Sequence, residues 1–157
     1  MRTLIDKVAV VTGASSGIGR STAVRLGAKC ARVGVHYRSD ERGARETVAA
    51  VDAAGGGGFL LHVDFAQSHA AETLWSAFDD HSVVVNIVVN NAGAPSKGGI
   101  RAATEREFDS LFAVNLKAPL FIVQQGLERM RDGGRIINVT SVGTRVALPP
   151  EVMYLAL

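Results

Sequence analysis

Hydrophobic and polar residues follow two alternating patterns along this chain. Short β-branched runs predict five strands, at Val8–Thr12, Arg32–Tyr37, Phe59–Val63, Ile87–Asn90 and Arg135–Val139. Their nearly continuous apolar character is typical of strands that helices cover on both faces. Longer amphipathic segments separate the runs, and this alternation predicts βαβ units and therefore a parallel sheet.

Three of the intervening segments carry apolar residues at helical spacing. Ala44, Val48 and Val51 form a core stripe for a helix over about Asp40–Ala54, and a second helix is predicted after Ser68. The stripe of that second helix consists of Leu74, Trp75 and Phe78.

A further helix is predicted to begin at the sequence Thr104-Glu105-Arg106-Glu107, which fits a capping box. We expect one face of this helix to carry Phe108, Leu111, Phe112 and Asn115. Trp75 and the phenylalanines are expected in the core rather than stacked on a cofactor.

The run Gly55-Gly56-Gly57-Gly58 precedes a predicted strand, so we expect it to stop a helix and loosen a turn rather than to hold phosphate. The chain shows no internal repeat, linker or low-complexity tail. With 157 residues, it is long enough for one domain and too short for two ordinary ones, so residues 1–157 are expected to form a single domain.

Composition indicates a soluble globular protein, with 47% hydrophobic and 20% charged residues. The net charge is +2 with both signs interspersed, so neither a nucleic acid nor a membrane is expected as a partner. The apolar run Val83–Val89 is interrupted by Asn86 and is too short to span a bilayer. A single cysteine, Cys30, excludes an internal disulfide and fits the cytoplasm.

The four histidines, His36, His62, His69 and His81, show no metal-ligand spacing, so no metal is predicted, and His62 is expected to be structural.

The strongest chemical signal is Thr12-Gly13-Ala14-Ser15-Ser16-Gly17-Ile18-Gly19, which follows the first strand and begins a helix. Glycines permit a tight turn and a close approach of the backbone to a pyrophosphate, and helix N-terminal N–H groups favour an anion. An ordinary strand-to-helix turn is the alternative interpretation. A P-loop is excluded because Gly19 is followed by Arg20-Ser21 rather than by Lys-Ser/Thr.

The glycine spacing, G-x-x-x-G-x-G, resembles that of the classical short-chain dehydrogenases/reductases, and four further matches follow in order. They are Asn90-Asn91-Ala92-Gly93 after the fourth strand, Asn115 on the next helix, Gly134–Ser141 across the fifth strand, and Tyr154 thirteen residues after Ser141. The matches extend over essentially the whole chain. The resemblance implies a Rossmann-type three-layer α/β/α fold with a parallel sheet in the order 3-2-1-4-5.

The resemblance also implies the catalytic residues. Tyr154 would be the general acid/base, Ser141 would hydrogen-bond the substrate carbonyl, and Asn115 would support the active-site water and lysine relay. Taken singly, Asn115 is also compatible with a helix residue bonded to backbone, and Ser141 with a turn residue.

The resemblance places the cofactor on three segments. The first is the glycine-rich turn, with Gly13, Ser15, Ser16, Gly17, Ile18 and Gly19. The second is Asp64, which would hydrogen-bond the adenine ring, with Phe65 beside it. The alternative interpretation of Asp64 is an acid in the N-cap region of a helix. The third is Asn91, Ala92 and Gly93, which would line the adenosine ribose.

The residues at the end of the second strand bear on whether the cofactor is NADP or NAD. Tyr37 stands where NAD-preferring relatives carry an acid, and Arg38 offers a forked contact to a 2′-phosphate. Asp40 is assigned to the first turn of the next helix. NADP(H) is therefore favoured over NAD(H), although Ser16 stands where many NADP-preferring relatives have a basic residue.

The sequence departs from the family pattern at its end. The family lysine four residues after the tyrosine would follow Leu157, the last residue here. We therefore expect a chain that is C-terminally incomplete relative to the family, with an exposed fifth strand and impaired turnover. A homo-oligomer is expected for the full-length form.

The resulting hypothesis is an NADP(H)-dependent oxidoreductase that reduces a carbonyl or oxidises a secondary alcohol on a small-molecule or acyl substrate. The stretches Val35–Ser39 and Asn115-Leu116-Lys117-Ala118-Pro119 resemble the 3-oxoacyl-carrier-protein reductase branch. A non-catalytic nucleotide-binding remnant is the main alternative. An extended-family epimerase or dehydratase would carry G-x-x-G-x-x-G instead, and a P-loop kinase would carry a lysine after the last glycine of the turn.

Overall fold

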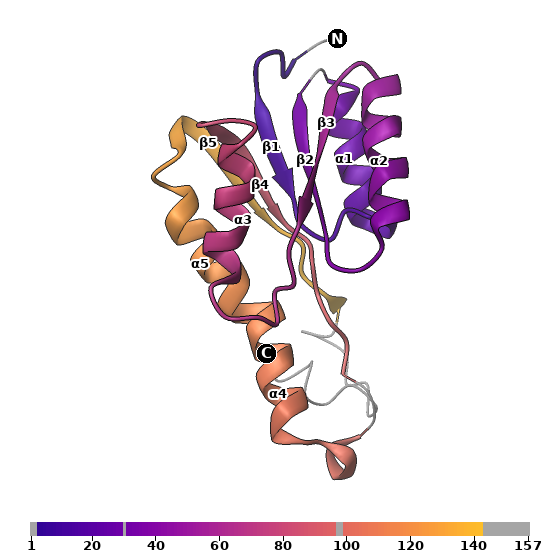
Figure 1. Cartoon of the computed structure of the whole chain (residues 1–157), viewed down its shortest axis with the longest axis vertical. Helices are drawn as coiled ribbons and strands as arrows, with labels where there is room; N and C mark the ends of the chain where they lie inside the picture. Colours follow the sequence, from indigo (N-terminus) through magenta and orange to yellow (C-terminus); the bar gives the residue numbers. More distant parts are fainter. Residues whose placement is uncertain (1–2, 30, 97–98, 143–157) are drawn as a thin grey trace.

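The computed structural model describes residues 3–29, 31–96 and 99–142. Strands and helices alternate through most of this length (Figure 1). In order, the elements are β1 (Val8–Val11), α1 (Gly17–Gly27), β2 (Arg32–Tyr37), α2 (Glu41–Ala53), β3 (Gly57–His62), α3 (Ala70–Asp79), β4 (Val85–Asn90), the 3₁₀ turn η1 (Ile100–Ala102), α4 (Glu105–Phe112), the π-helical turn η2 (Ala113–Lys117), α5 (Ala118–Gly126) and β5 (Met130–Asn138).

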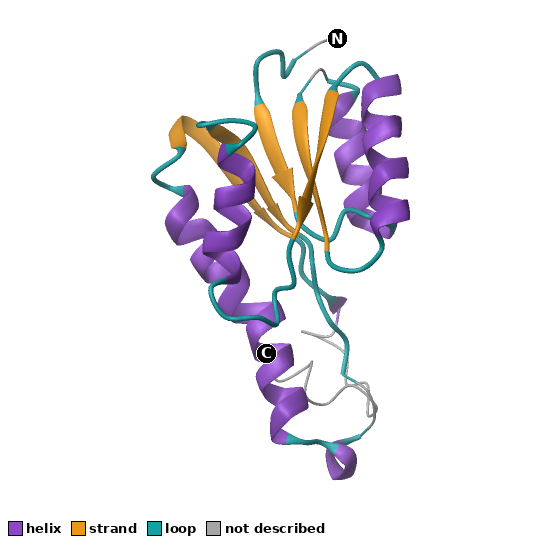
Figure 2. Ribbon diagram, viewed as in Figure 1, coloured by secondary structure: helices purple, strands orange, loops and turns teal. Residues whose placement is uncertain are grey.

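The five strands form one parallel sheet in the order β3-β2-β1-β4-β5, as predicted. Helices α1 and α2 cover one face, and α3 and α5 cover the other (Figure 2). The sheet is therefore the middle layer of three, and the predicted Rossmann-type fold is confirmed. Because all strands are parallel, their carboxyl ends share one edge, and the order reverses between β1 and β4 at that edge.

Two hydrophobic clusters fill the spaces between the layers. The cluster under α1 and α2 consists mainly of alanine and valine, for example Ala9, Ala23 and Val33. The cluster under α3 and α5 contains the large aromatic side chains, including Trp75 and Phe78, both almost fully buried. The prediction that these two residues belong to the core is confirmed.

The prediction was wrong for the phenylalanines of α4. Phe108 is 45% exposed and Phe112 is 36% exposed, and their rings contact each other at 4.9 Å between centroids. The buried stripe is instead Leu111, Val114, Ala118 and Ile122, which are spaced by three or four residues, and the last three belong to the cluster under α3 and α5. The two aromatic rings of this helix are exposed instead.

The ends of the elements agree with their local sequence. Thr104 caps α4, since its hydroxyl accepts the Glu107 N–H at 3.2 Å, and Asp40 caps α2 by accepting the Gly43 N–H at 2.9 Å. The glycine run differs in part from its prediction. Gly55, with φ +98°, follows α2, but Gly57 and Gly58 already belong to β3 and pair with β2.

Candidate functional site

A cavity of about 530 Å³ lies at the carboxyl edge of the sheet, around the ends of β1, β2, β3 and β4. It is lined by Gly13, Ser15, Ser16, Gly17, Ile18, His36, Tyr37, Arg38, Ser39, Asp40, Val63, Asp64, Phe65, Asn91, Ala92, Gly93, Ala94, Pro95 and Val114. All of the residues predicted to bind the cofactor line this cavity except Gly19, which is buried behind it. This edge is where ligands bind in parallel α/β sheets.

The glycine-rich turn after β1 has the backbone geometry that its sequence predicts. Gly13 and Gly17 have φ angles of +63° and +55°, a region that favours glycine. A Cβ atom on Gly13 would lie 2.8 Å from the Cα of Ala92, and one on Gly19 would lie 2.6 Å from Nδ2 of Asn91. The turn therefore depends on glycine both for its shape and for its contact with the segment after β4.

Helix α1 begins at the cavity. The first intrahelical hydrogen bond runs from the Arg20 N–H to the Ser16 carbonyl, at 3.0 Å. The amides of Gly17, Ile18 and Gly19 precede it and have no acceptor within the helix. Two of these residues line the cavity, so the turn offers N–H donors and the positive end of the helix dipole to an anion.

Thr12 and Asn91 join the turn to the segment after β4. The Thr12 hydroxyl accepts the N–H groups of Asn91 and Ala92, both at 2.9 Å. The Asn91 amide donates to the carbonyls of Thr12, at 2.8 Å, and Gly13, at 3.1 Å. Asn91 was predicted to line the ribose site; it does line the cavity, but its side-chain N–H groups bond the turn.

His36 also lines the cavity, and sequence analysis did not place it there. It is the penultimate residue of β2 and is 3% exposed. Its Nδ1 lies 2.9 Å from the Gly13 N–H, and its Nε2 lies 3.1 Å from the Val63 carbonyl. The signal in the sequence was a polar residue just before the end of a parallel strand, at the same edge of the sheet as the glycine turn.

The end of β2 carries the residues relevant to the choice between NADP and NAD. Arg38 and Tyr37 line the cavity, and Tyr37 stacks on His62 at 4.9 Å between ring centroids. One carboxylate oxygen of Asp40 is engaged by the Gly43 N–H at the start of α2, so Asp40 is the N-cap of this helix rather than the predicted residue of its first turn. His62 helps to hold this corner, because its Nε2 lies 2.8 Å from the Arg38 carbonyl.

Asp64 and Phe65 follow β3 and form another part of the cavity wall. One Asp64 oxygen accepts the Ala66 N–H at 3.0 Å, within a local turn. Asp64 is not the N-cap of α3, because that position is His69. The Phe65 ring is buried and stacks on the His36 ring, with centroids 4.0 Å apart and an interplanar angle of 3°.

Two of the three predicted catalytic residues lie in the described part of the chain. Asn115 lies in the π-helical turn η2; its Nδ2 donates to the Ala94 carbonyl and its Oδ1 accepts the Ala94 N–H, both at 2.9 Å. Ser141 follows β5. Tyr154 lies outside the described residues. Asn115 therefore borders the cavity through Ala94, which lines it.

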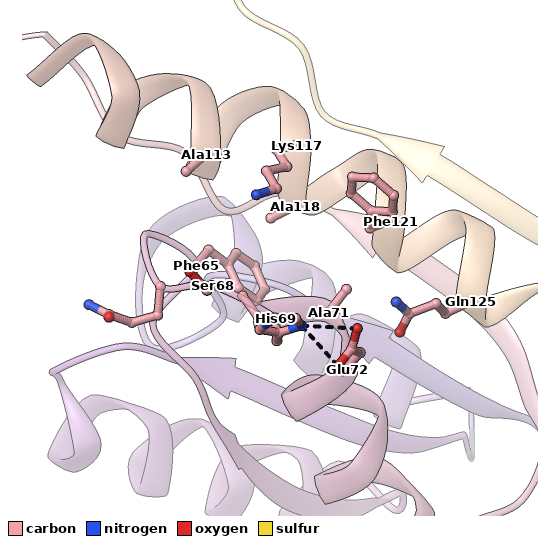
Figure 3. Close-up of a pocket in the computed structure, with 12 residues that line it drawn as sticks. Phe65, Ser68, His69, Ala71, Glu72, Ala113, Lys117, Ala118, Phe121 and Gln125 are labelled. Carbon is pink, nitrogen blue, oxygen red and sulfur yellow. Dashed lines mark hydrogen bonds and ion pairs between the residues drawn. The ribbon is translucent and has the colours of Figure 1, made fainter. Parts of the chain in front are cut away.

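A second cavity, of about 270 Å³, lies between the start of α3 and the segment η2–α5. Figure 3 shows Phe65, His69 and Glu72 on one side of it, with Lys117 and Phe121 on the other. Of the residues predicted to bind the cofactor, only Phe65 lines it, and Phe65 also lines the first cavity.

Among the described residues, no helix is both long and apolar enough to span a bilayer. In the same residues, no group of three or more His, Cys, Asp and Glu side chains is placed to hold a metal ion.

Comparison with known proteins gives consistent matches over nearly the whole chain. The sequence model of the family described as short chain dehydrogenase matches residues 7–156. The chain is similar to an uncharacterised oxidoreductase of Methylorubrum extorquens, with 37% identity over 154 residues, which are 98% of this chain and 62% of that protein. It is also similar to Versicolorin reductase 1 of Aspergillus parasiticus, with 36% identity over 152 residues, or 96% of this chain and 58% of that protein.

A similar solved structure is the landomycin C-6 ketoreductase LanV with bound NADP and rabelomycin. The TM-score is 0.92 and the identity 40%, over 98% of this chain and 65% of that one. The chain thus spans about three fifths of the length of the curated relatives it matches.

Proposed function

The chain belongs to the short-chain dehydrogenase family, and we propose that it forms the cofactor-binding part of an NADP(H)-dependent oxidoreductase that reduces a carbonyl or oxidises a secondary alcohol. The observation that carries this proposal is the cavity at the carboxyl edge of the sheet. There the glycine turn, the start of α1, Arg38, Asp64 and the Asn91–Gly93 segment line one space.

The residues present fit a dinucleotide. Gly13 and Gly17 leave the turn without side chains, and the adjacent amides at the start of α1 suit a pyrophosphate. Asp64 and Phe65 lie farther along the same wall, where the adenine would be held. When bound, the nicotinamide would supply or accept the hydride.

The preference for NADP(H) over NAD(H) rests on Arg38. A guanidinium suits a 2′-phosphate because it offers several fixed N–H donors and a permanent charge. An NAD site requires a carboxylate for the ribose 2′-hydroxyl. Asp40, the acid nearest to this position in the sequence, already caps α2 through one of its oxygens. Solved relatives such as LanV contain NADP.

In the catalytic step, Tyr154 would donate a proton to the substrate oxygen during reduction and accept it back during oxidation. Ser141 would hydrogen-bond the same oxygen and polarise the carbonyl. Asn115 would support the active-site water and lysine relay from the border of the cavity, where its side-chain amide hydrogen-bonds the Ala94 backbone.

Two classes of carbonyl substrate are candidates, a linear 3-oxoacyl thioester and a ketone on a fused-ring scaffold. The sequence resembles the 3-oxoacyl-carrier-protein reductase branch, which acts on a linear acyl thioester. The similar proteins with assigned names include versicolorin reductases, hydroxynaphthalene reductase-like proteins and angucycline ketoreductases. We propose a ketone on a fused-ring scaffold, with the acyl thioester as the competing substrate in the assay.

A non-catalytic nucleotide-binding protein is the second candidate. It is favoured by Asn115, whose amide oxygen and nitrogen both bond the backbone of Ala94, as a purely structural residue would. Such a protein would bind NADPH and reduce no carbonyl.

We propose a homo-oligomer, a soluble protein and a cytoplasmic location. Phe108, Phe112, Leu116 and Leu120 form an exposed apolar stripe along α4, η2 and α5, which suits contact with a second copy. Sedimentation analysis of the protein with Leu116→Glu tests this contact, and an unchanged oligomer would contradict it.

The proposed cytoplasmic location rests on the single cysteine, Cys30, which allows no internal disulfide.

The test of the function is a titration with NADPH and NADH, followed by nicotinamide fluorescence. NADPH should bind more tightly than NADH, and Arg38→Ala should weaken NADPH by about tenfold or more while leaving NADH unchanged. Arg131→Ala, an exposed arginine on β5, is the matched control.

Absence of binding by either nucleotide would contradict the proposal. If NADPH binds, its oxidation by a fused-ring ketone and by a 3-oxoacyl thioester then separates the two substrate classes. Turnover of neither would favour the non-catalytic candidate.

A further inference from the structure

His36 is the one histidine of the described chain that lines the candidate cofactor cavity, and its ring contacts the walls on both sides. One nitrogen, Nδ1, faces the Gly13 N–H at 2.9 Å, and the other, Nε2, faces the Val63 carbonyl at 3.1 Å. The backbone carbonyl of His36 also accepts the Ala14 N–H at 2.8 Å. The same residue therefore binds the glycine-rich turn twice and the end of β3 once.

The two partners determine the protonation of the ring. A backbone N–H only donates and a carbonyl only accepts, so Nδ1 must be unprotonated and Nε2 must carry the hydrogen. The neutral ring is consistent with its surroundings, because burial lowers the pKa of His36 to about 4. The hydrogen bond to the Val63 carbonyl raises this pKa; of the titratable groups nearby, His62 lowers the pKa of His36 and Asp64 raises it.

The ring also supports Phe65. The two rings are parallel within 3° and 4.0 Å apart, and both are almost fully buried. Phe65 lies on the wall assigned above to the adenine, whereas Gly13 lies in the turn assigned to the pyrophosphate. His36 thus connects two parts of the site that lie far apart in the sequence.

We propose that His36 is a positioning residue for cofactor binding, which fixes the Gly13 amide and the Phe65 ring in the arrangement that receives the dinucleotide. This inference rests on the function proposed above. If the Nδ1 acceptor is lost, the Gly13 N–H is left without this partner in a partly buried position, and of the two bonds between the turn and His36 only that from the Ala14 N–H to the His36 carbonyl remains. Loss of this acceptor should therefore weaken binding of the dinucleotide and not only lower the stability of the fold.

Two variants separate these effects because each keeps one of the two ring contacts. In His36→Asn, the side-chain oxygen can replace Nδ1 and accept the Gly13 N–H, while the donor to Val63 is lost. In His36→Gln, the longer amide can replace Nε2 and donate to Val63, while the acceptor for Gly13 is lost. His81→Gln is the control, since His81 is exposed and stacks on Phe59 away from the cavity.

The dissociation constant for NADPH is measured for all four proteins, together with the melting temperature. We expect His36→Asn to stay within about threefold of the wild type and His36→Gln to weaken binding by about tenfold or more. Both should melt at a lower temperature than the wild type, and the control should leave the dissociation constant unchanged. Equal dissociation constants for the two His36 variants would overturn the inference, since a merely structural residue predicts no such difference.

Histidine ¹⁵N spectra of the wild-type protein provide a test that needs no variant to fold. They should show His36 as the neutral Nε2–H tautomer at about pH 7 and still neutral at about pH 6. A cation or an Nδ1–H tautomer under these conditions would also overturn the inference. Failure of the wild-type protein to bind NADPH is a different result, because it contradicts the proposed function while the spectra still decide the role of the ring.

Discussion

The two faces of the sheet are packed by different kinds of side chain. Under α1 and α2 the helices approach closely through glycine, as where a Cβ on Gly27 would lie 2.9 Å from Cγ1 of Val51. Under α3 and α5 the space is filled by large rings, and Trp75 donates its indole N–H to the Ile122 carbonyl at 3.1 Å. Small residues bring backbone groups close to a ligand, whereas large ones bury more apolar area.

This difference separates two roles within one domain. The glycine-rich face positions the turn between β1 and α1, from which the candidate cofactor site is built. On the aromatic face, Trp75 and Phe78 lie outside that site, and we expect them to contribute mainly to stability. Changes on the aromatic face should therefore alter the free energy of unfolding, and changes near the turn should alter nucleotide binding as well.

The largest effect is expected from Trp75→Ala on the aromatic face. It removes a fully buried ring and a buried hydrogen bond, and should lower the free energy of unfolding by about 3–5 kcal/mol. Urea unfolding measures the loss, and Val83→Ala, at a side chain that is 77% exposed, is the control with little expected change. The NADPH affinity of the folded fraction should stay the same; a large loss of affinity would show that the two faces are not separable.

Gly19→Ala should have the next largest effect, this time on both quantities. The added methyl group would meet the Gly13 carbonyl oxygen and Nδ2 of Asn91, so the turn must shift, at about 1–3 kcal/mol. NADPH binding should weaken by about tenfold or more, because the amides of the turn move with it. Gly57→Ala is the control, since a Cβ there would lie at an ordinary 3.5 Å from Cγ of Arg32. Unchanged NADPH affinity in Gly19→Ala would contradict this assignment.

Acid should destabilise the glycine-rich side through His36. Its pKa is lowered to about 4 in the folded protein, against about 6.5 when unfolded, so only the unfolded chain takes up this proton between those values. Stability should fall by on the order of 2 kcal/mol as the pH drops from about 6.5 to about 4. Urea unfolding across this range measures the slope, which should be smaller in His36→Asn. The same slope in that variant would assign it to other groups.

The smallest effect is expected on the aromatic side, at the ion pair between Asp79 and Arg129. Two hydrogen bonds, at 2.8 and 2.6 Å, lower the pKa of Asp79. Its contribution is therefore present above about pH 4 and lost as the pH falls further. Because the carboxylate is partly exposed, Asp79→Asn should cost less than about 1 kcal/mol at neutral pH. Asp80→Asn is the control, and equal losses for both variants would show that the pair adds nothing.

Local sequence patterns were sufficient for most of the fold. The β-branched runs identified all five strands, and the stripes at helical spacing identified α2 and α3. The cap at Thr104 is confirmed because a capping bond joins residues only three apart. Asp40, predicted in the first turn of the next helix, is instead its N-cap. The glycine turn was also predictable, since positive φ angles at Gly13 and Gly17 require glycine whatever surrounds them.

The candidate site was predictable in part. Most of its predicted residues do line one cavity, because parallel strands end at one edge and the motifs follow those strands. The sequence did not reveal that Asn115 bonds Ala94 or that His36 bonds Gly13, since these partners are 21 and 23 residues apart. Such pairs form only when different elements come together.

By itself, then, the sequence determined the order of the elements, the parallel sheet and the glycine turn, because each depends on the conformation and periodicity of neighbouring residues. The tertiary structure alone decided which side of α4 and α5 is buried, which leaves Phe108 and Phe112 exposed. It also decided that His36 is a neutral ring between Gly13 and Val63. These features depend on the surface against which an element packs, and that surface comes from distant parts of the chain.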